Sequence, residues 1–404
     1  MSVIVQKYGG SSVADAGRIC QVAERVMRTR RDGHDVVVVV SAMGHTTDTL
    51  LALAKQVSPN PDRRELDMLL TAGERISMAL LSMAIRALGG DAISFTGSQS
   101  GIITNDRHVD ARIIEVRPFR VQDELARGRI VVIAGYQGVS YRREITTLGR
   151  GGSDTTAVAM AAALGAEYCE ICSDVDGVYT ADPRVVPQAH RIPTLSFEET
   201  QELAEAGAKV LNAQAVEFAK DKGIAIYARA TSSPLPGPDP SADGTVVRRY
   251  PPRTPGIVVG VASERDVLLL DSRASSFALL ECLDAHSVAG KQLHQRGDSR
   301  LTVVVSRENL HEEARVREDL RARFADQVQI VDDLSAVSVV GAGINASFEP
   351  LRRGSGALTS AGIRTSDTTT SSFRITWMVP RERVDDAVRG LHQAFLEHPP
   401  PLVS

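Results

Sequence analysis

The sequence lacks the features that mark secreted, membrane-bound or nucleic-acid-binding proteins. It has four cysteines in 404 residues, too few for a disulfide framework, and a reducing cytoplasm fits this composition. No apolar run approaches the length of a membrane span. The net charge is -4 and no basic block stands out, which argues against a nucleic-acid surface. The composition therefore predicts a globular cytoplasmic protein whose partners are neither nucleic acids nor membranes.

Common cofactor motifs are also absent or incomplete. There is no Gly-x-x-x-x-Gly-Lys-Ser/Thr loop, which excludes the commonest other way of binding ATP. Gly341 to Ala346 matches the dinucleotide fingerprint on paper, but no acidic residue follows at the expected distance, so we interpret it as a chance match. Cys169 and Cys172 form a C-x-x-C in a predicted buried strand without a second pair. We interpret them as packing residues, and no metal site built by the protein alone is expected.

The sequence does contain a regular alternation of strands and helices in its first 230 residues. Val36 to Val40 are five consecutive valines, which is typical of a strand buried on both faces of a parallel sheet. Each predicted strand ends in a turn rich in Gly, Ser or Thr, which places a ligand site at the carboxyl ends of the strands. We predict strands at 2–8, 36–40, 92–95, 130–134, 167–172 and 224–229, and helices at 15–31, 63–88, 155–164 and 197–219.

The stretch from Thr146 to Arg184 is the centre of this arrangement. Two glycines, a serine and an aspartate precede an Ala-rich helix, and the unpaired N–H groups at such a helix start suit an anion. Arg150 adds a forked cation that can hold a carboxylate through two bonds. The same residues are also ordinary helix-capping chemistry, so the stretch alone leaves both interpretations open.

The second half of the chain has a different texture. Residues 232–256 are rich in proline and predict a linker. Beyond the linker, the periodicity predicts a weak internal repeat of two βαββαβ-like units. We therefore divide the chain into a domain at 1–231, the linker at 232–256, and two small modules at 257–333 and 334–404. The first module is predicted to begin with a strand at 257–261, and the second to hold strands at 336–341 and 372–379.

Six motifs of the first domain resemble those of the aspartate kinase family, in the family's order and spacing. They are Lys7–Ser12, Val40–Gly44, Thr47–Asp48, Leu70–Arg75, Gly149–Asp154 and Ser173–Arg184. The resemblance implies an α/β fold: an amino-acid-kinase three-layer sandwich with a mainly parallel sheet, followed by two ACT-like modules. It also implies phosphorylation of L-aspartate by ATP to 4-phospho-L-aspartate, with Mg²⁺ held mainly by ATP oxygens and water.

The resemblance implies the following roles. Lys7 would contact the transferring phosphoryl group, Gly9 and Gly10 would let the backbone approach it, and Asp154 would orient Lys7 or a Mg²⁺-bound water. Glu74 would pair with the substrate ammonium group and Arg150 with a carboxylate. The implied aspartate site comprises Ser41, Thr47, Glu74, Arg150, Gly151, Gly152 and Ser153, with Ser41 also able to donate to a phosphate. The implied ATP site comprises Lys7, Gly9, Gly10, Ser173, Asp174, Tyr179, Asp182, Arg184 and Lys209.

Structural alternatives exist for these side chains. Lys7 could be a surface lysine at a strand end, Glu74 an exposed carboxylate paired with Arg75, and Tyr179 a core aromatic residue. At the level of the whole chain, the alternatives are another amino-acid-kinase-fold enzyme that phosphorylates a different carboxylate, or a non-catalytic regulatory subunit.

The C-terminal half departs from the family where relatives bind lysine or threonine. Asp271 to Ser275 replaces a glycine turn, and Ser372 stands where a glutamate is usual. The sequence leaves feedback control by these amino acids open. The resemblance implies a homodimer or homotetramer that assembles through the ACT-like modules.

Overall fold

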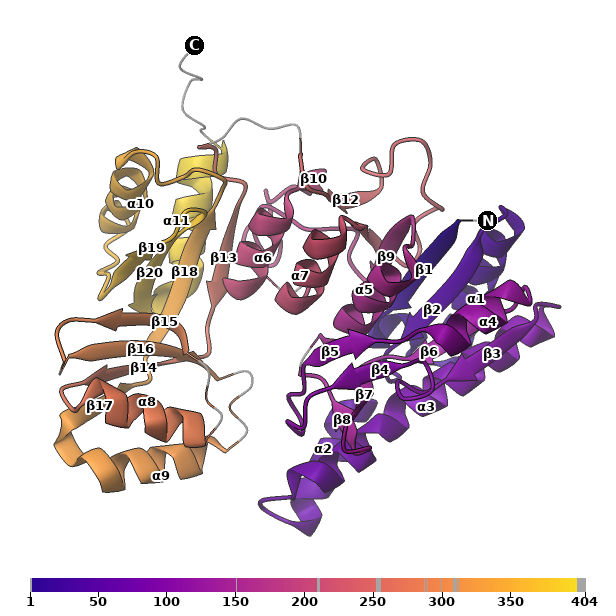
Figure 1. Cartoon of the computed structure of the whole chain (residues 1–404). Helices are drawn as coiled ribbons and strands as arrows, with labels where there is room; N and C mark the ends of the chain where they lie inside the picture. The colour runs from indigo at the N-terminus through magenta and orange to yellow at the C-terminus, as the bar shows by residue number, and fades with distance from the viewer. Residues whose placement is uncertain are drawn as a thin grey trace. The chain divides into compact units, whose positions relative to one another are not determined.

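The computed structural model describes residues 2–149, 151–208, 211–251, 256–286, 288, 290–298, 300–307, 310 and 312–397. The chain forms two compact units that are interleaved in sequence (Figure 1). The first comprises residues 1–178, 191–201 and 209–253, and the second comprises residues 179–190, 202–208 and 254–404.

A mainly parallel sheet of eight strands runs through the first unit. Its strand order is β10-β12-β11-β9-β1-β2-β6-β3, and the pair β11–β12 is antiparallel. The strands are β1 (Val3–Tyr8), β2 (Asp35–Val40), β3 (Ala92–Phe95), β6 (Ile130–Ala134), β9 (Tyr168–Ser173), β10 (Thr194–Leu195), β11 (Ala225–Ala230) and β12 (Gly244–Val247). A second sheet of the order β5-β4-β7-β8 contains β4 (Ile102–Thr104), β5 (Ile113–Val116), β7 (Gln137–Ser140) and β8 (Ile145–Thr147).

Helices cover both faces of the large sheet, which gives the three layers that the sequence predicts. The helices of this part of the chain are α1 (Ala16–Arg31), α2 (Thr46–Val57), α3 (Arg63–Ala87), α4 (Phe119–Ala126), α5 (Gly152–Leu164), α6 (Phe197–Glu205) and α7 (Ala213–Lys222). Ile19 of α1 and Leu81 of α3 pack in one buried cluster with Val36, Val38 and Val40 of β2. On β2 these valines alternate with Val37 and Val39, which are also fully buried, so both faces of this strand lie in the core.

The helix predicted at 197–219 is in fact two helices, α6 and α7. Gly207 lies between them with a backbone φ of +107°, a conformation that favours glycine. A Cβ atom at Gly207 would lie 2.3 Å from the backbone oxygen of Ser263. Asn212 then begins α7, because its side chain accepts hydrogen bonds from the backbone N–H groups of Gln214 and Ala215. The hydrophobic periodicity continues across this break, so the periodicity alone predicted a single helix.

By length and composition, α3 would qualify as a membrane span, with a mean hydropathy of 1.4 over its best window. The helix instead packs against α1 and α2 and against strands β3, β6 and β8 of the same unit. It also carries Asp67 and Glu74, whose carboxyl groups are buried in hydrogen-bonding contacts with protein groups. These contacts identify α3 as a core helix of the first unit.

The second unit contains two antiparallel four-stranded sheets. One has the order β15-β16-β14-β17 and the other the order β13-β18-β20-β19. The strands are β13 (Gly260–Glu264), β14 (Val267–Ser272), β15 (Gly290–Gln295), β16 (Leu301–Ser306), β17 (Val328–Val331), β18 (Leu334–Val340), β19 (Thr368–Thr370) and β20 (Arg374–Pro380). The helices are α8 (Ser276–Ala285), α9 (Glu313–Phe324), α10 (Glu349–Ser360) and α11 (Val384–His392).

The first of these sheets belongs to a complete βαββαβ module, β14-α8-β15-β16-α9-β17. The second module, β18-α10-β19-β20-α11, lacks a final strand of its own among the described residues, and β13 fills that place by pairing antiparallel with β18. The sequence analysis put this strand in the first module, and the pairing corrects that assignment. The edge strand of a sheet presents backbone N–H and C=O groups that any adjacent strand can pair with, so the order of strands in the sequence does not determine the pairing.

The predicted linker also contributes structure. Within it, β12 pairs with β11 and extends the large sheet of the first unit. Conversely, residues 179–190 leave the first unit and belong to the second. Ala181 and Val186 of this segment are buried in one core cluster with Trp377, and the Val261 N–H donates a 2.7 Å hydrogen bond to the Thr180 carbonyl. Burial of these apolar side chains explains the position of the segment.

Candidate active site

Turns from neighbouring strands meet at the carboxyl edge of the large sheet. Strand β1 pairs in parallel with β2 on one side and with β9 on the other. The Gly9 N–H donates to the Cys172 carbonyl at 3.2 Å, and the Ser41 N–H donates to the Tyr8 carbonyl at 3.1 Å. The glycine turn after β1 therefore lies between the serine turns after β2 and β9, which is the arrangement the sequence predicts for a ligand site.

Gly10 is required by the close approach of two of these turns. A Cβ atom at this position would lie 2.9 Å from the Ala42 carbonyl oxygen and 3.1 Å from that of Gly44. The Gly44 N–H in turn donates a 3.1 Å hydrogen bond to the Gly10 carbonyl. Close packing of backbone on backbone fixes the shape of the edge and leaves no room for a side chain at Gly10.

Lys7 and Asp154 are brought together from β1 and from the first turn of α5. Lys7 Nζ lies 2.6 Å from Asp154 Oδ1, and both side chains are about nine-tenths buried. The contact is an ion pair rather than a directed hydrogen bond, because Oδ1 accepts no hydrogen bond of acceptable angle within the described residues. Lys7 is therefore not the surface lysine of the structural alternative. Its ammonium group is held by a carboxylate at the edge where the turns meet.

Glu74 is the most unusual carboxyl group of this edge. It lies in the middle of α3 and is 3% exposed, and its Oε1 accepts a 3.1 Å hydrogen bond from the Ala42 N–H. Its Oε2 is buried without a hydrogen-bond donor among the residues that the structure describes. Burial raises the pKa of Glu74 to about 7, against the weaker opposing effect of backbone hydrogen bonds. The ion pair with Arg75 considered above is excluded by this burial.

The neighbouring Gly73 explains how Glu74 reaches its place. A Cβ atom at Gly73 would lie 2.7 Å from the Cβ atom of Ala42, so glycine lets α3 pack directly on the turn after β2. This contact presents the Glu74 side chain to the Ala42 N–H. Thr47 follows the turn after β2 in the sequence. It lies in the first helical turn of α2 and is half-buried.

Helix α5 begins at the glycine pair that the sequence singled out. Gly151 has a φ of +72°, and a Cβ atom there would lie 2.7 Å from Asn212 Nδ2. A Cβ atom at Gly152 would lie 2.6 Å from the Cβ atom of Leu148. Ser153 is buried against Gly135, the residue after β6. The start of α5 is thus anchored to the same sheet edge, with its N–H groups and its positive dipole end there.

On the other side of Lys7, Ser173 ends β9 and Asp174 follows it, exposed. Thr231 was not among the predicted site residues, yet it is tied to this turn. Its backbone N–H and its Oγ1 both donate to the Ser173 carbonyl, at 2.8 and 3.0 Å, and its Oγ1 lies 2.6 Å from Ser12 Oγ. Its place directly after a strand parallel to β9 was the signal that could have found it.

The remaining predicted nucleotide residues do not join this group in one unit. Tyr179, Asp182 and Arg184 belong to the second unit, whereas Ser173 and Asp174 belong to the first. The Arg184 guanidinium donates to both carboxylate oxygens of Asp182, at 2.8 and 3.0 Å, which lowers the pKa of Asp182. Arg150 and Lys209 lie outside the described residues.

The edge thus combines a buried ammonium group, the positive dipole end of a helix, and an ionisable buried carboxyl group with one oxygen that accepts no described hydrogen bond. The ammonium group and the helix start can stabilise a phosphoryl group. The carboxylate can accept a cationic group of a small substrate. This donor set is suited to phosphoryl transfer onto an amino acid.

The comparisons with known proteins define the class first. The family model described as "Amino acid kinase family" matches residues 2–228, which include all of the large sheet except β12 and the last two residues of β11. This is more than half of the chain.

Relatives that match nearly the whole chain define it further. An aspartokinase from Mycolicibacterium smegmatis is 45% identical over 412 residues, covering 98% of this chain and 96% of that protein. One from Thermus thermophilus is 40% identical over 407 residues, covering 98% and 99%. The chain belongs to the amino acid kinase family and, within it, to the aspartokinases.

Solved structures agree in fold. Escherichia coli aspartokinase III in complex with aspartate and ADP superposes with a TM-score of 0.84 at 24% identity, covering 98% of this chain and all of that one. An aspartate kinase from Synechocystis is 35% identical with a TM-score of 0.55, covering 99% of this chain and 71% of that one. The amino-acid-kinase sandwich and the smaller ACT-like sheets that the sequence predicts are therefore confirmed.

Proposed function

We propose that the protein transfers the γ-phosphoryl group of ATP to the side-chain carboxylate of L-aspartate, giving 4-phospho-L-aspartate and ADP. The observation that carries this proposal is the pairing of Lys7 with Asp154 at the sheet edge, where the turn after β2 also contacts the buried Glu74 through the Ala42 N–H. The aspartokinase relatives over nearly the full length support the same substrate. We also place the protein in the cytoplasm, in agreement with four free cysteines.

The nucleophile in this reaction needs no general base, since a carboxylate is already ionised at neutral pH. Catalysis then depends on positioning and on charge neutralisation. Lys7 would contact the transferring phosphoryl group, held in place by Asp154, and Gly9 and Gly10 would let the backbone approach it closely. Mg²⁺ would arrive with ATP and neutralise phosphate charge, and the Asp154 carboxylate would orient Lys7 or a water bound to that ion.

We assign the amino-acid substrate to the side of the edge where Glu74 lies. Its second carboxylate oxygen would accept the α-ammonium group, and a nearby cation lowers the pKa of a buried carboxyl group and keeps it ionised. Ser41 and Thr47 would donate from the turn after β2. The substrate carboxylates would meet Arg150, Gly151, Gly152 and Ser153 at the start of α5.

We assign the nucleotide to the side where β9 ends, with Ser173 and Asp174 next to Gly9. Tyr179, Asp182, Arg184 and Lys209 complete the proposed nucleotide set, on the resemblance of Ser173 to Arg184 to the family motif. We further propose that the chain forms a homodimer or homotetramer through the two ACT-like modules, in whose sheets β15, β17 and β19 are edge strands.

An ADP-release assay with a panel of acceptors tests the function. We expect turnover with L-aspartate and at least about a hundredfold lower kcat/KM with L-glutamate, N-acetylglutamate and UMP. Preference for one of the other acceptors would favour a different carboxylate or nucleotide kinase. No ADP release with any acceptor, from protein with the expected circular dichroism spectrum, would favour the regulatory-subunit alternative.

A further inference from the structure

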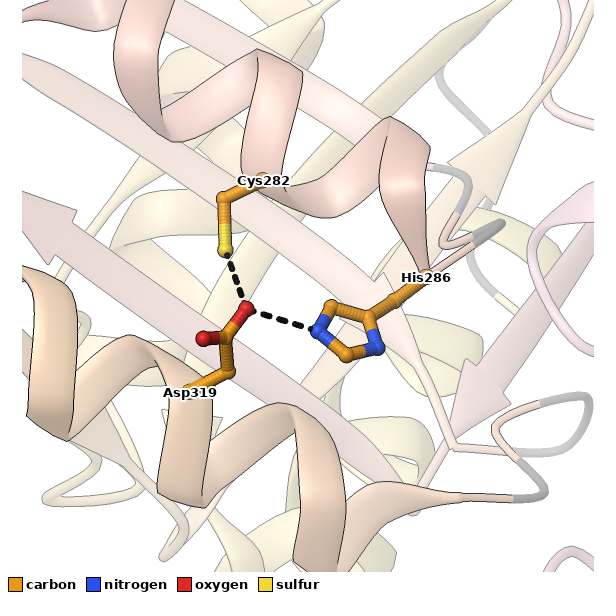
Figure 2. A group of neighbouring side chains, drawn as sticks. All are labelled: Cys282, His286 and Asp319. Atoms are coloured by element: carbon orange, nitrogen blue, oxygen red, sulfur yellow. Dashed lines mark hydrogen bonds and ion pairs between the residues drawn. The ribbon is translucent and has the colours of Figure 1, made fainter.

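A cluster of side chains in the first βαββαβ module has no part in the proposed phosphoryl transfer. Cys282 lies in α8, His286 follows one helical turn later at the helix end, and Asp319 lies in α9 (Figure 2). Residues four apart on a helix share one face, so Cys282 and His286 point together toward α9. Among the described residues, these three bring a sulfur, a nitrogen and an oxygen donor within 4.8 Å of one another.

The carboxylate of Asp319 is the centre of the cluster. Its Oδ2 accepts a hydrogen bond from Cys282 Sγ at 3.4 Å and lies 2.9 Å from His286 Nε2. Its Oδ1 accepts a hydrogen bond from Arg323 Nε at 2.8 Å, one turn along α9. Arg323 thereby orients the carboxylate and leaves Oδ2 aimed at the thiol and the imidazole, as outer partners of metal ligands do.

The two separations that involve the Asp319 oxygen are near those of a tetrahedral zinc site. Zn²⁺ binds nitrogen and oxygen at about 2.0 Å and thiolate sulfur at about 2.3 Å, so its tetrahedral donors lie roughly 3.3–3.6 Å apart. The observed sulfur–oxygen separation is 3.4 Å, and the nitrogen–oxygen separation of 2.9 Å needs to open by only about 0.4 Å. Rotation of the two partly exposed side chains, without movement of the backbone, provides such a shift.

Burial and charge also suit a divalent ion. Cys282 is fully buried, and the side chains of His286 and Asp319 are 11% and 24% exposed. The site is therefore apolar on the sulfur side, where Leu279 and Leu283 belong to the same core cluster, and reachable by water on the other. A thiolate and a carboxylate together balance two positive charges, and a neutral imidazole completes the set.

We propose that Cys282, His286 and Asp319 bind one Zn²⁺ ion between α8 and α9, with water in the fourth position. Binding releases the thiol proton to solvent and involves no change of oxidation state. The ion joins two helices that otherwise meet over the sheet β15-β16-β14-β17 through side-chain packing and the hydrogen bonds to Asp319. It would stabilise this module in proportion to the zinc concentration.

Co²⁺ is a spectroscopic probe for such a site, since a bound thiolate gives a charge-transfer band in the near ultraviolet. Titration of the full-length, metal-stripped protein, without ATP, is expected to give this band and intense visible bands at one Co²⁺ per chain. Zn²⁺ should displace the Co²⁺ and raise the melting temperature. Absence of the charge-transfer band in the wild-type protein would overturn the proposal and leave the cluster as a hydrogen-bonded group alone.

Variants locate the ion. Cys282→Ser, His286→Asn and Asp319→Asn are each expected to weaken Zn²⁺ binding by about tenfold or more, because even outer partners contribute that much. The matched controls are Cys20→Ser, an exposed cysteine of the first unit, and His294→Ala, an exposed histidine of β15. Equal affinity in all five variants, or loss of the band in Cys20→Ser, would also overturn it. These measurements do not use kinase activity, so their outcome is independent of the proposed function.

Discussion

Glu74 is a buried carboxyl group with one oxygen that faces no described donor, and this makes its contribution to substrate binding testable. We expect Glu74→Gln to raise KM for aspartate by about tenfold or more and to leave KM for ATP nearly unchanged. Glutamine keeps the acceptor for the Ala42 N–H, so the fold should be retained. Initial rates with each substrate varied in turn measure the two constants. An equal effect on both would give Glu74 a structural role instead.

The raised pKa of Glu74 also predicts a pH dependence of stability. The pKa of Glu74 in the folded protein is about 7, above its ordinary value of 4.5, so between pH 4.5 and 7 the folded protein holds a proton that the unfolded chain has lost. Ionised Glu74 therefore destabilises the substrate-free fold above pH 7, by up to about 3 kcal/mol. We expect Glu74→Gln to melt higher than wild type at pH 8, with the difference shrinking to near zero at pH 4.5. A constant difference across this range would contradict the environment described here.

Lys7 is expected to act on the reacting phosphate rather than on the fold. Lys7→Ala should lower kcat by about a hundredfold or more, because a fixed charge at the transition state is lost. The variant leaves Asp154 buried without its cation, so Lys7→Ala combined with Asp154→Asn provides the control for stability. Circular dichroism and single-turnover ADP release measure the two effects. A folded Lys7→Ala enzyme with nearly normal kcat would remove Lys7 from the mechanism.

Between secondary-structure elements, a buried charge network holds the sheet to α1. Glu170 of β9 accepts a 2.6 Å hydrogen bond from Arg25 of α1 and a 2.9 Å one from Gln6 of β1, and it lies 3.4 Å from Nε of Arg229 in β11. All four side chains are at most 2% exposed. The network therefore joins a helix to three adjacent strands of the core.

We expect Glu170→Ala to destabilise the first unit by about 3–5 kcal/mol, because the buried Arg25 guanidinium would lose its carboxylate and Arg229 would keep only the half-exposed Asp243 at 3.7 Å. Thermal denaturation should show a fall in melting temperature of roughly 10 °C. Glu170→Gln retains a hydrogen-bond acceptor but no charge, so its melting temperature should lie between those of the wild type and Glu170→Ala. A change of less than about 1 kcal/mol for Glu170→Ala would mean that water reaches the two arginines after substitution.

For the whole molecule, the open question is whether the ACT-like modules respond to amino acids. Asp271 to Ser275 contains no glycine, and the Ser272 Oγ accepts a 3.1 Å hydrogen bond from the Ala274 N–H, so the turn is closed by its own side chain. Ser372 is exposed and brings no carboxylate to an effector ammonium group. Loss of one charged hydrogen bond weakens binding by about 1.5–3 kcal/mol, or tenfold and more.

Lysine and threonine, singly or together, are therefore expected to inhibit weakly or not at all. Aspartate-dependent ADP release is to be measured over increasing concentrations of each amino acid, with the assembly state followed by light scattering. Cooperative inhibition at sub-millimolar concentrations would show that these departures do not disable the modules. A monomer in light scattering would contradict the proposed assembly through residues 257–404.

Much of the chain is determined by local sequence. The valine run of β2, the Ala-rich α5 and the strand β6 were predicted closely, because burial on both faces and helical periodicity are properties of neighbouring residues. The meeting of the Lys7, Ser41 and Ser173 turns also followed, since parallel strands bring their carboxyl ends to one edge. The short strands β4, β5, β7 and β8 were not predicted, because three or four residues carry too little periodicity.

Other features were decided by tertiary structure alone. The pairing of β13 with β18, the burial of Ala181 and Val186 in the second unit, and the break at Gly207 depend on contacts with distant segments. The buried state of Glu74 and the approach of Cys282 to Asp319 likewise join residues far apart in the chain. Sequence specifies which groups are present and which face of an element they share. Burial away from water, and the partner groups on neighbouring elements, exist only once the elements are packed. They therefore determine the ionisation of buried groups such as Glu74 and the placement of Cys282 next to Asp319.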